Sequence, residues 1–189
     1  MWRESQASGP QPESRGVPTW HRSSRPWCST SVTSYSGDEL ADAAATFDRE
    51  YVLHAPAARV WPWLEQVGKA RGGWYTPRWF ERLVPARFHG ARVLNAAWRL
   101  HVGEVVPDYG PSSLTVAVLN PPHALVYRGG HKRTTFTWAL LLTDLSGERC
   151  VLHFRFRISR AGRLMRTVGK LFDHATVALL VAGLRERIR

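Results

Sequence analysis

Hydrophobic and polar residues alternate along two runs in the second half of the chain. From Thr134 to Thr143, Phe, Trp and Leu alternate with Thr and Ala, and from Cys150 to Ser159, Leu, Phe and Ile alternate with His and Arg. This period of two is typical of strands with one face on a core and the other toward solvent. We predict two such strands, and we assign His153, Arg155 and Arg157 to the solvated outer face in preference to the cationic rim of a site.

Shorter runs of strand-like residues come earlier in the chain, separated by Pro, Gly, Asn and Asp. Such punctuation favours an antiparallel meander. The additional predicted strands are Asp48 to His54, Arg99 to Val106, Ser113 to Leu119 and Ala124 to Arg128. The predicted turns are Asp108 to Pro111, Asn120 to Pro122, Gly129-Gly130 and Ser146-Gly147.

Helical spacing appears in three places. Apolar residues recur at this spacing between Ala57 and Val67, directly after a proline that suits a helix start. A second short helix, Pro77 to Leu83, follows the bend at Gly72-Gly73, and a long helix with basic ends runs from Gly162 to Arg189. The apolar stripe predicted for the long helix is Leu164, Val168, Leu171, Phe172, Ala175, Leu179 and Ala182. One strand, two short helices, a meander and a closing helix define an α+β fold, not a doubly wound sheet.

The first 45 residues are rich in Ser, Pro, Arg and Gly. This composition cannot bury enough apolar surface to offset the entropy of ordering, so it predicts a disordered tail followed by one domain over residues 46–189. An organelle transit peptide and an upstream extension from a misassigned start codon are the alternatives for the tail.

Composition bounds the class of protein. The 189 residues are 44% hydrophobic and 22% charged, which is typical of one globular domain. Cys28 and Cys150 give neither a disulfide framework nor metal-ligand spacing, so we expect a reducing cytoplasm. The longest late apolar run, Val177 to Leu184, is too short to span a membrane.

The chain carries 26 basic and 15 acidic residues, a net charge of +11. That charge attracts nucleic acid or anionic lipid headgroups. No nucleic-acid-binding motif accompanies it, so we do not expect a nucleic acid partner. Peripheral contact with a membrane stays open as an alternative, using the basic residues of the long helix and its lead-in: Arg160, Arg163, Arg166, Lys170, Arg185, Arg187 and Arg189.

One stretch carries a family resemblance. An AP-x-x-x-VWPWL helix begins at Ala55, Q-x-G-x-x-R-x-G-W-Y follows and ends at Tyr75, and a glutamate comes six residues later. The matching positions are Ala55, Pro56, Val60, Trp61, Pro62, Trp63, Leu64, Gln66, Gly68, Arg71, Gly73, Trp74, Tyr75 and Glu81. With the order of elements, this pattern resembles the SRPBCC superfamily, which includes START, Bet v 1-like and polyketide cyclase/dehydrase-type proteins. Thr76, Pro77 and Arg78 depart from it.

The resemblance implies a helix-grip fold, in which a curved antiparallel sheet wraps around the long C-terminal helix and encloses a pocket for lipids, polyketides or other apolar molecules. It does not imply one reaction, because the superfamily includes carriers, aromatase/cyclases and chaperone activators. Binding of a hydrophobic small molecule is our first hypothesis, and a polyketide aromatase/cyclase-like enzyme is the second.

The sequence contains candidate residues for a ligand pocket but no catalytic motif. Despite eight histidines, the chain has no G-x-S-x-G elbow, metal-spaced His pair or phosphate loop, so we assign no catalytic residue, metal or cofactor. Aromatic walls with a few polar tips suit a small-molecule cavity, although core packing explains the same residues. Arg71 either holds a ligand carboxylate or, as we prefer, pairs with Glu65 or Glu81. The candidate ligand-binding residues are Trp63, Arg71, Trp74, Tyr75, Trp98, Tyr127 and Trp138.

Overall fold

The computed structural model describes residues 38, 43–107, 112–131, 133–160 and 162–189, with the backbone alone described for 163–170 and 172. Most of the predicted tail and the predicted turn from Asp108 to Pro111 lie outside the described residues. Within the described part, strand pairing already begins in the tail region, at Ala45.

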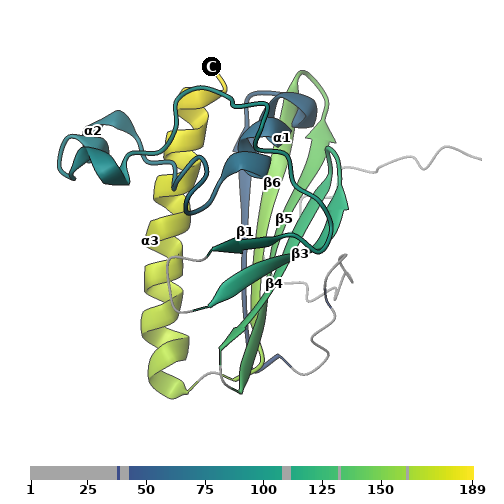
Figure 1. Ribbon diagram of the computed structural model, residues 1–189, viewed down its shortest axis with the longest axis vertical. Helices are drawn as coiled ribbons and strands as arrows, with labels where there is room; N and C mark the ends of the chain where they lie inside the picture. The colour runs from purple at the N-terminus through teal and green to yellow at the C-terminus, as the bar shows by residue number, and fades with distance from the viewer. Residues whose placement is uncertain (1–37, 39–42, 108–111, 132, 161) are drawn as a thin grey trace, which may run out of the picture. The chain divides into compact units, whose positions relative to one another are not determined.

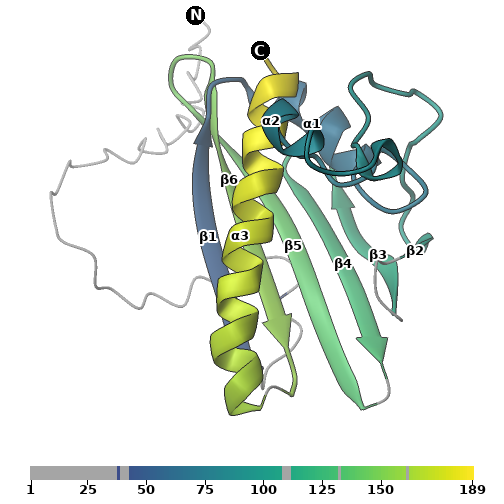
Figure 2. The ribbon, with the colours of Figure 1, turned by 90° about the vertical axis from the view of Figure 1, so that its left-hand side faces the viewer.

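Six strands form one antiparallel sheet in the order β1-β6-β5-β4-β3-β2, and a long helix, α3, packs against its inner face (Figures 1 and 2). The strands are β1 (Ala45–Leu53), β2 (Val105–Pro107), β3 (Ser113–Asn120), β4 (Ala124–His131), β5 (Thr134–Leu145) and β6 (Arg149–Ile158). The helices are α1 (Ala57–Gln66), α2 (Arg78–Glu81), the 3-10 helix η1 (Ala86–Phe88) and α3 (Arg163–Arg187). This is the expected α+β arrangement, a sheet gripping a C-terminal helix.

The alternating runs form strands with one apolar face, as predicted, and these strands lie in the centre of the sheet. In β5 and β6, Leu140 pairs with Phe154 and Leu142 with Leu152, and all four side chains reach the core. The neighbouring positions on each strand face outward, where Ala139 and Leu141 join a second, smaller apolar cluster. The register therefore places the aromatic side chains of β5 and β6 beneath α3.

Two strand predictions were wrong in extent. The strand expected from Arg99 to Val106 is only the three-residue β2. The turn expected at Gly129-Gly130 is part of β4, because the ring of Phe136 lies over Gly129 and a Cβ there would stand 2.3 Å from its Cζ. A close approach of a neighbouring ring, and not a turn, explains this glycine.

The core-facing side of α3 also differs from the predicted stripe. Among the described side chains of α3 and its C-cap, the buried hydrophobic ones are Val177, Leu180, Val181, Leu184 and Ile188. In the predicted stripe, Leu171 is 71% exposed, Ala175 is exposed, and Leu179 and Ala182 are half-buried. The side chains of Leu164, Val168 and Phe172 lie outside the described ones. Apolar residues occupy more than one side of this helix, so helical spacing alone did not identify the buried side.

The outer face of β6 is not simply solvated, which corrects the assignment of its three basic residues. Nε2 of His153 lies 2.7 Å from Oδ1 of Asp48, and Arg155 donates to Asp48 at 2.9 Å and to Asp38 at 2.8 Å. Arg157 pairs with Asp38 at 3.1 Å. The β1–β6 register sets Asp48 directly opposite Arg155, so a cross-strand charge pair forms there.

Candidate ligand-binding site

An aromatic stack lies on the inner face of the sheet. Trp138 of β5 stacks on Tyr127 of β4 with centroids 5.6 Å apart, and on Phe154 of β6 at 6.4 Å. These three side chains meet because the antiparallel register sets Trp138 opposite Tyr127 on one side and next to the β6 aromatics on the other. Trp138 is only half-buried although it lies mid-strand in a central strand. Part of its side chain is therefore accessible to solvent.

Trp74 extends this stack to the end of the sheet. It comes from the loop after α1 and stacks on Trp138 at 5.8 Å with an interplanar angle of 23°. Its indole N–H donates to the carbonyl of Thr176 in α3 at 3.2 Å. Trp74 thus bridges the sheet and α3, and it is also half-buried.

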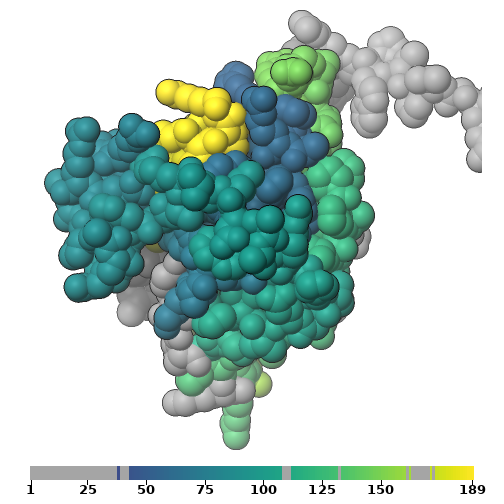
Figure 3. Space-filling view, turned by 45° about the horizontal axis from the view of Figure 1, so that its top comes forward, coloured from purple at the N-terminus to yellow at the C-terminus, as the bar shows by residue number. Residues whose placement is uncertain are grey.

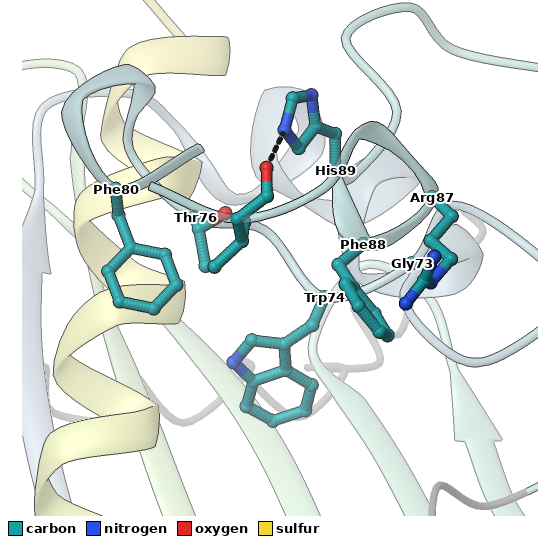
Figure 4. Close-up of a pocket in the computed structure, with 8 residues that line it drawn as sticks. Gly73, Trp74, Thr76, Phe80, Arg87, Phe88 and His89 are labelled. Atoms are coloured by element: carbon teal, nitrogen blue, oxygen red, sulfur yellow. Dashed lines mark hydrogen bonds between the residues drawn. The ribbon is translucent and has the colours of Figure 1, made fainter. Parts of the chain in front are cut away.

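A pocket of about 300 Å³ lies beside Trp74 (Figure 4). Phe80 lies on one side of it and Phe88 and Arg87 on the other, with Trp74 below (Figure 4). The lining residues are Gly73, Trp74, Thr76, Phe80, Val84, Arg87, Phe88 and His89. The volume is at the lower end of the range for small-molecule pockets, and the apolar wall with a few polar groups has the usual composition.

The polar groups of this pocket differ in what they offer a ligand. Nε2 of His89 lies 2.7 Å from the carbonyl oxygen of Glu81 and 3.0 Å from that of Val84, so this nitrogen carries the proton and donates to the backbone. Thr76 Oγ1 is buried and has no hydrogen-bond partner among the described residues. Arg87 lies over the ring of Phe88, 4.8 Å from its centroid. Thr76 and Arg87 are therefore the groups available to a polar substituent.

A buried ion cluster fixes the pocket segment to the end of α3. The guanidinium group of Arg187 donates to Glu81 Oε1 at 3.2 Å and to the carbonyl oxygens of Ala91 at 2.7 Å and Gly90 at 2.9 Å. Arg92 also pairs with Glu81. Burial alone would raise the pKa of Glu81, but the hydrogen bonds from Arg92 and Arg187 outweigh it and hold that pKa below its ordinary value. Glu81 is therefore an ionised anchor.

Close backbone packing accompanies this cluster. A Cβ on Gly183 of α3 would stand 2.6 Å from the backbone nitrogen of Thr76, a distance that real Cβ atoms essentially never show. The absence of a side chain lets α3 pass directly against the backbone of Tyr75 and Thr76. Nearby, Gly73 has φ of 75°, as expected for the bend at the glycine pair. The pocket wall is thus built on the end of α3.

Trp63 and Tyr75 are buried in the core, and neither is among the residues that line the pocket beside Trp74. The Tyr75 hydroxyl donates to the carbonyl of Trp63 at 2.8 Å, and the two rings meet edge to face. Arg187 covers the Tyr75 ring, 4.6 Å from its centroid. Both residues are buried, so they support the wall that Trp74 forms.

Arg71 is a structural residue, as preferred, but its partner is different. It pairs with Glu104 at 2.9 Å and donates to the carbonyl oxygen of Trp98 at 2.7 Å. Glu65 instead pairs with Arg99, and Glu81 with the cluster described above. Arg71 contacts Glu65 only through its backbone carbonyl, at 3.3 Å. The predicted pairing with a carboxylate of Glu65 or Glu81 was wrong because residues 98–104 return beside Arg71, a long-range contact that spacing does not reveal. Trp98 is half-buried and takes part through its backbone.

Tyr127 is fully buried beneath Trp138, and its hydroxyl has no hydrogen-bond partner among the described residues. Burial raises the pKa of this hydroxyl well above its ordinary value of 10, so it stays protonated and remains a donor. Of the predicted site residues, Trp74, Tyr127 and Trp138 come together in one stack, whereas Trp63, Arg71, Tyr75 and Trp98 belong to the supporting shell.

Sequence reasoning missed the outer half of the pocket. Phe80, Val84, Arg87, Phe88 and His89 line it, and they come from the short α2 and η1 elements and the residues beside them. A cluster of aromatic residues in a segment with little regular structure was the available signal. Within the described part of the chain, no group of three or more His, Cys, Asp or Glu side chains is arranged to hold a metal ion.

The strand order, the long helix in the grip of the sheet and the aromatic site beneath it define a helix-grip protein. No protein-family model matches the chain, and no curated protein matches it. Among solved structures, the hypothetical protein jhp0584 from Helicobacter pylori matches at a TM-score of 0.54 and 12% identity, over 86% of this chain and 98% of its own. CalU16 from Micromonospora echinospora matches at 0.47 and 12% identity, over 74% and 83%. Norcoclaurine synthase from Thalictrum flavum matches at 0.48 and 12% identity, over 76% and 93%. The chain has the expected helix-grip fold.

Proposed function

We propose that this protein binds a flat, apolar small molecule of the lipid or polyketide type. The observation that carries the proposal is a pocket of about 300 Å³ with a largely apolar wall, to which the half-buried Trp74 contributes while it also stacks on Trp138. A flat ring that entered the pocket would cover the exposed part of the indole and gain stacking energy of about 0.5–1.5 kcal/mol beyond the burial of apolar area.

The pocket's polar groups support a ligand with one polar or anionic substituent. Arg87 offers a cation at the wall, and Thr76 offers a buried hydroxyl that has no partner among the described residues. Nε2 of the lining histidine, His89, donates to two backbone carbonyls, which fixes the imidazole ring in the pocket wall. The low cysteine content favours a cytoplasmic location.

A pocket-filling variant tests the proposal without removing any contact to the ligand. Val84→Trp should occupy the pocket, and Val93→Trp is the matched control because Val93 is exposed outside the pocket. The probe is 1-anilinonaphthalene-8-sulfonate, a flat ring system with one anionic group, followed by its emission and by displacement with palmitate. We expect Val84→Trp to weaken binding about tenfold or more while the control binds as the wild type does. Equal binding by both variants would refute the proposed site.

A further inference from the structure

Large apolar side chains gather on the surface of the segment that forms the outer pocket wall. Among the described residues, ten large hydrophobic side chains are exposed, and five of them lie between Trp79 and Leu94. Trp79 is 58% exposed, Leu83 74% and Phe88 57%. Burial of each of these side chains away from water would be favourable, so such a concentration indicates a surface that contacts a binding partner.

Three arginines share this surface. Arg78, Arg82 and Arg87 are exposed, and none of their guanidinium groups forms an ion pair with a described residue. The one acidic residue of the segment, Glu81, faces inward to Arg92 and Arg187 and does not offset them at the surface. The exposed face of residues 78–88 therefore combines apolar side chains with three arginines. The neighbouring carboxylate of Glu186 accepts from the backbone nitrogen of Arg78 at 3.1 Å and pairs with Arg92.

The shape of the molecule presents this face outward. The loop that carries α2 projects beyond α3 and forms a lobe on one side of the molecule (Figures 1 and 3). The buried cluster of Glu81 and Arg187 holds the base of the lobe, so its tip is presented on a fixed support. A flat surface approaching from that side meets α2 before it meets the sheet.

We propose that residues 78–88 dock the protein on an anionic phospholipid bilayer. An exposed tryptophan flanked by arginines suits the boundary between acyl chains and headgroups, where the indole is amphipathic and the guanidinium groups reach lipid phosphates. A protein partner with an acidic surface would not require Trp79, Leu83 and Phe88 to be uncovered together at the tip of a projecting loop. Docking does not depend on the occupancy of the pocket, although the same segment forms the pocket wall.

The test is flotation of the full-length, ligand-free protein with vesicles of phosphatidylcholine containing phosphatidylglycerol. The double variant Trp79→Ser/Leu83→Ser removes apolar contact, and Leu171→Ser is its control because Leu171 is equally exposed on α3. Arg82→Gln/Arg87→Gln removes charge, and Arg160→Gln is its control because Arg160 is exposed just before the other end of α3. All six substitutions in these four variants are at exposed positions, and circular dichroism confirms the fold of each variant.

We expect the affinity for vesicles to fall about tenfold in the apolar double variant and roughly fivefold for each arginine removed. Both controls should bind as the wild type does. If the test and control variants lost equal vesicle affinity, the proposal would be overturned, because the vesicle would then contact basic residues all over the protein and not residues 78–88 in particular. Lack of vesicle binding, or self-association that the apolar variant abolishes, would also overturn it.

Discussion

Arg187 is the residue whose replacement tests the architecture of the site most directly. Its side chain is 1% exposed, and besides Glu81, Ala91 and Gly90 it donates to the carbonyl oxygens of Gly183 at 2.8 Å and Thr76 at 3.2 Å. Arg187→Met keeps the apolar part of the side chain. It removes one of the two arginines that pair with Glu81, and it removes the hydrogen-bond donor of four backbone carbonyl groups. Removing one partner of a buried charge pair costs about 3–5 kcal/mol. Because Arg92 still pairs with Glu81, we expect the lower end, about 3 kcal/mol.

Urea unfolding followed by far-UV circular dichroism measures this effect. Domains are stable by only about 5–15 kcal/mol, so the midpoint should fall clearly while the slope stays unchanged. Arg185→Met is the matched control, since Arg185 is exposed and makes a single hydrogen bond to the carbonyl of Val52 at 3.0 Å; it should cost no more than about 0.5 kcal/mol. Arg187→Lys keeps the charge without the planar fork and should fall between the two. Equal losses for the two methionine variants would refute the anchoring role of Arg187.

Three further predictions concern stability and reactivity. The pKa of Glu81 is lowered in the folded protein, so ionised Glu81 stabilises the fold above the ordinary pKa of 4.5, and this stabilisation is lost as the pH falls below that value. The urea midpoint of Glu81→Gln should therefore depend less on pH, between about 6 and 3, than the midpoint of the wild type. Parallel curves of midpoint against pH for the two proteins would contradict this prediction. Gly183→Ala should lower the melting temperature despite the better helix propensity of alanine, whereas Gly162→Ala, which meets no atom within 4 Å, should not. Burial raises the pKa of the Cys150 thiol to about 11, so in a Cys28→Ser background it should react with Ellman's reagent only after denaturation; immediate reaction of the native protein would show that the end of β6 opens readily.

The period-two pattern of β5 and β6 predicted the centre of the sheet because both strands have one face on the core. The same logic failed for the outer face of β6, where Asp38 and Asp48 approach from a distant part of the chain and neutralise Arg155. Charge pairing between segments far apart in the sequence leaves no periodic signal. The assignment of Arg155 to open solvent was therefore wrong, although the side of the strand was right.

Only the aromatic residues of the candidate site that lie at the sheet could be predicted from the sequence. Trp74 and Trp138 stood out because a helix-grip fold brings mid-strand aromatics and the segment after the first helix to one end of the sheet. The outer wall depends on how residues 78–89 leave the body of the protein, and Arg187 and Gly183 of α3 decide that by tertiary contact. A terminal arginine looks the same in sequence whether it is free in solvent or, like Arg187, fully buried.

The near-parallel stack of Trp74, Trp138 and Tyr127 has an optical consequence. Rings at 22–23° to one another and less than 6 Å apart couple their electronic transitions, so this stack should contribute a distinctive signal to the near-ultraviolet circular dichroism spectrum. A bound molecule that turns the Trp74 indole would break its hydrogen bond to Thr176 and uncouple it from Trp138 together. The protein thus contains its own chromophore, with which compounds can be screened without a label while the natural ligand is still unidentified.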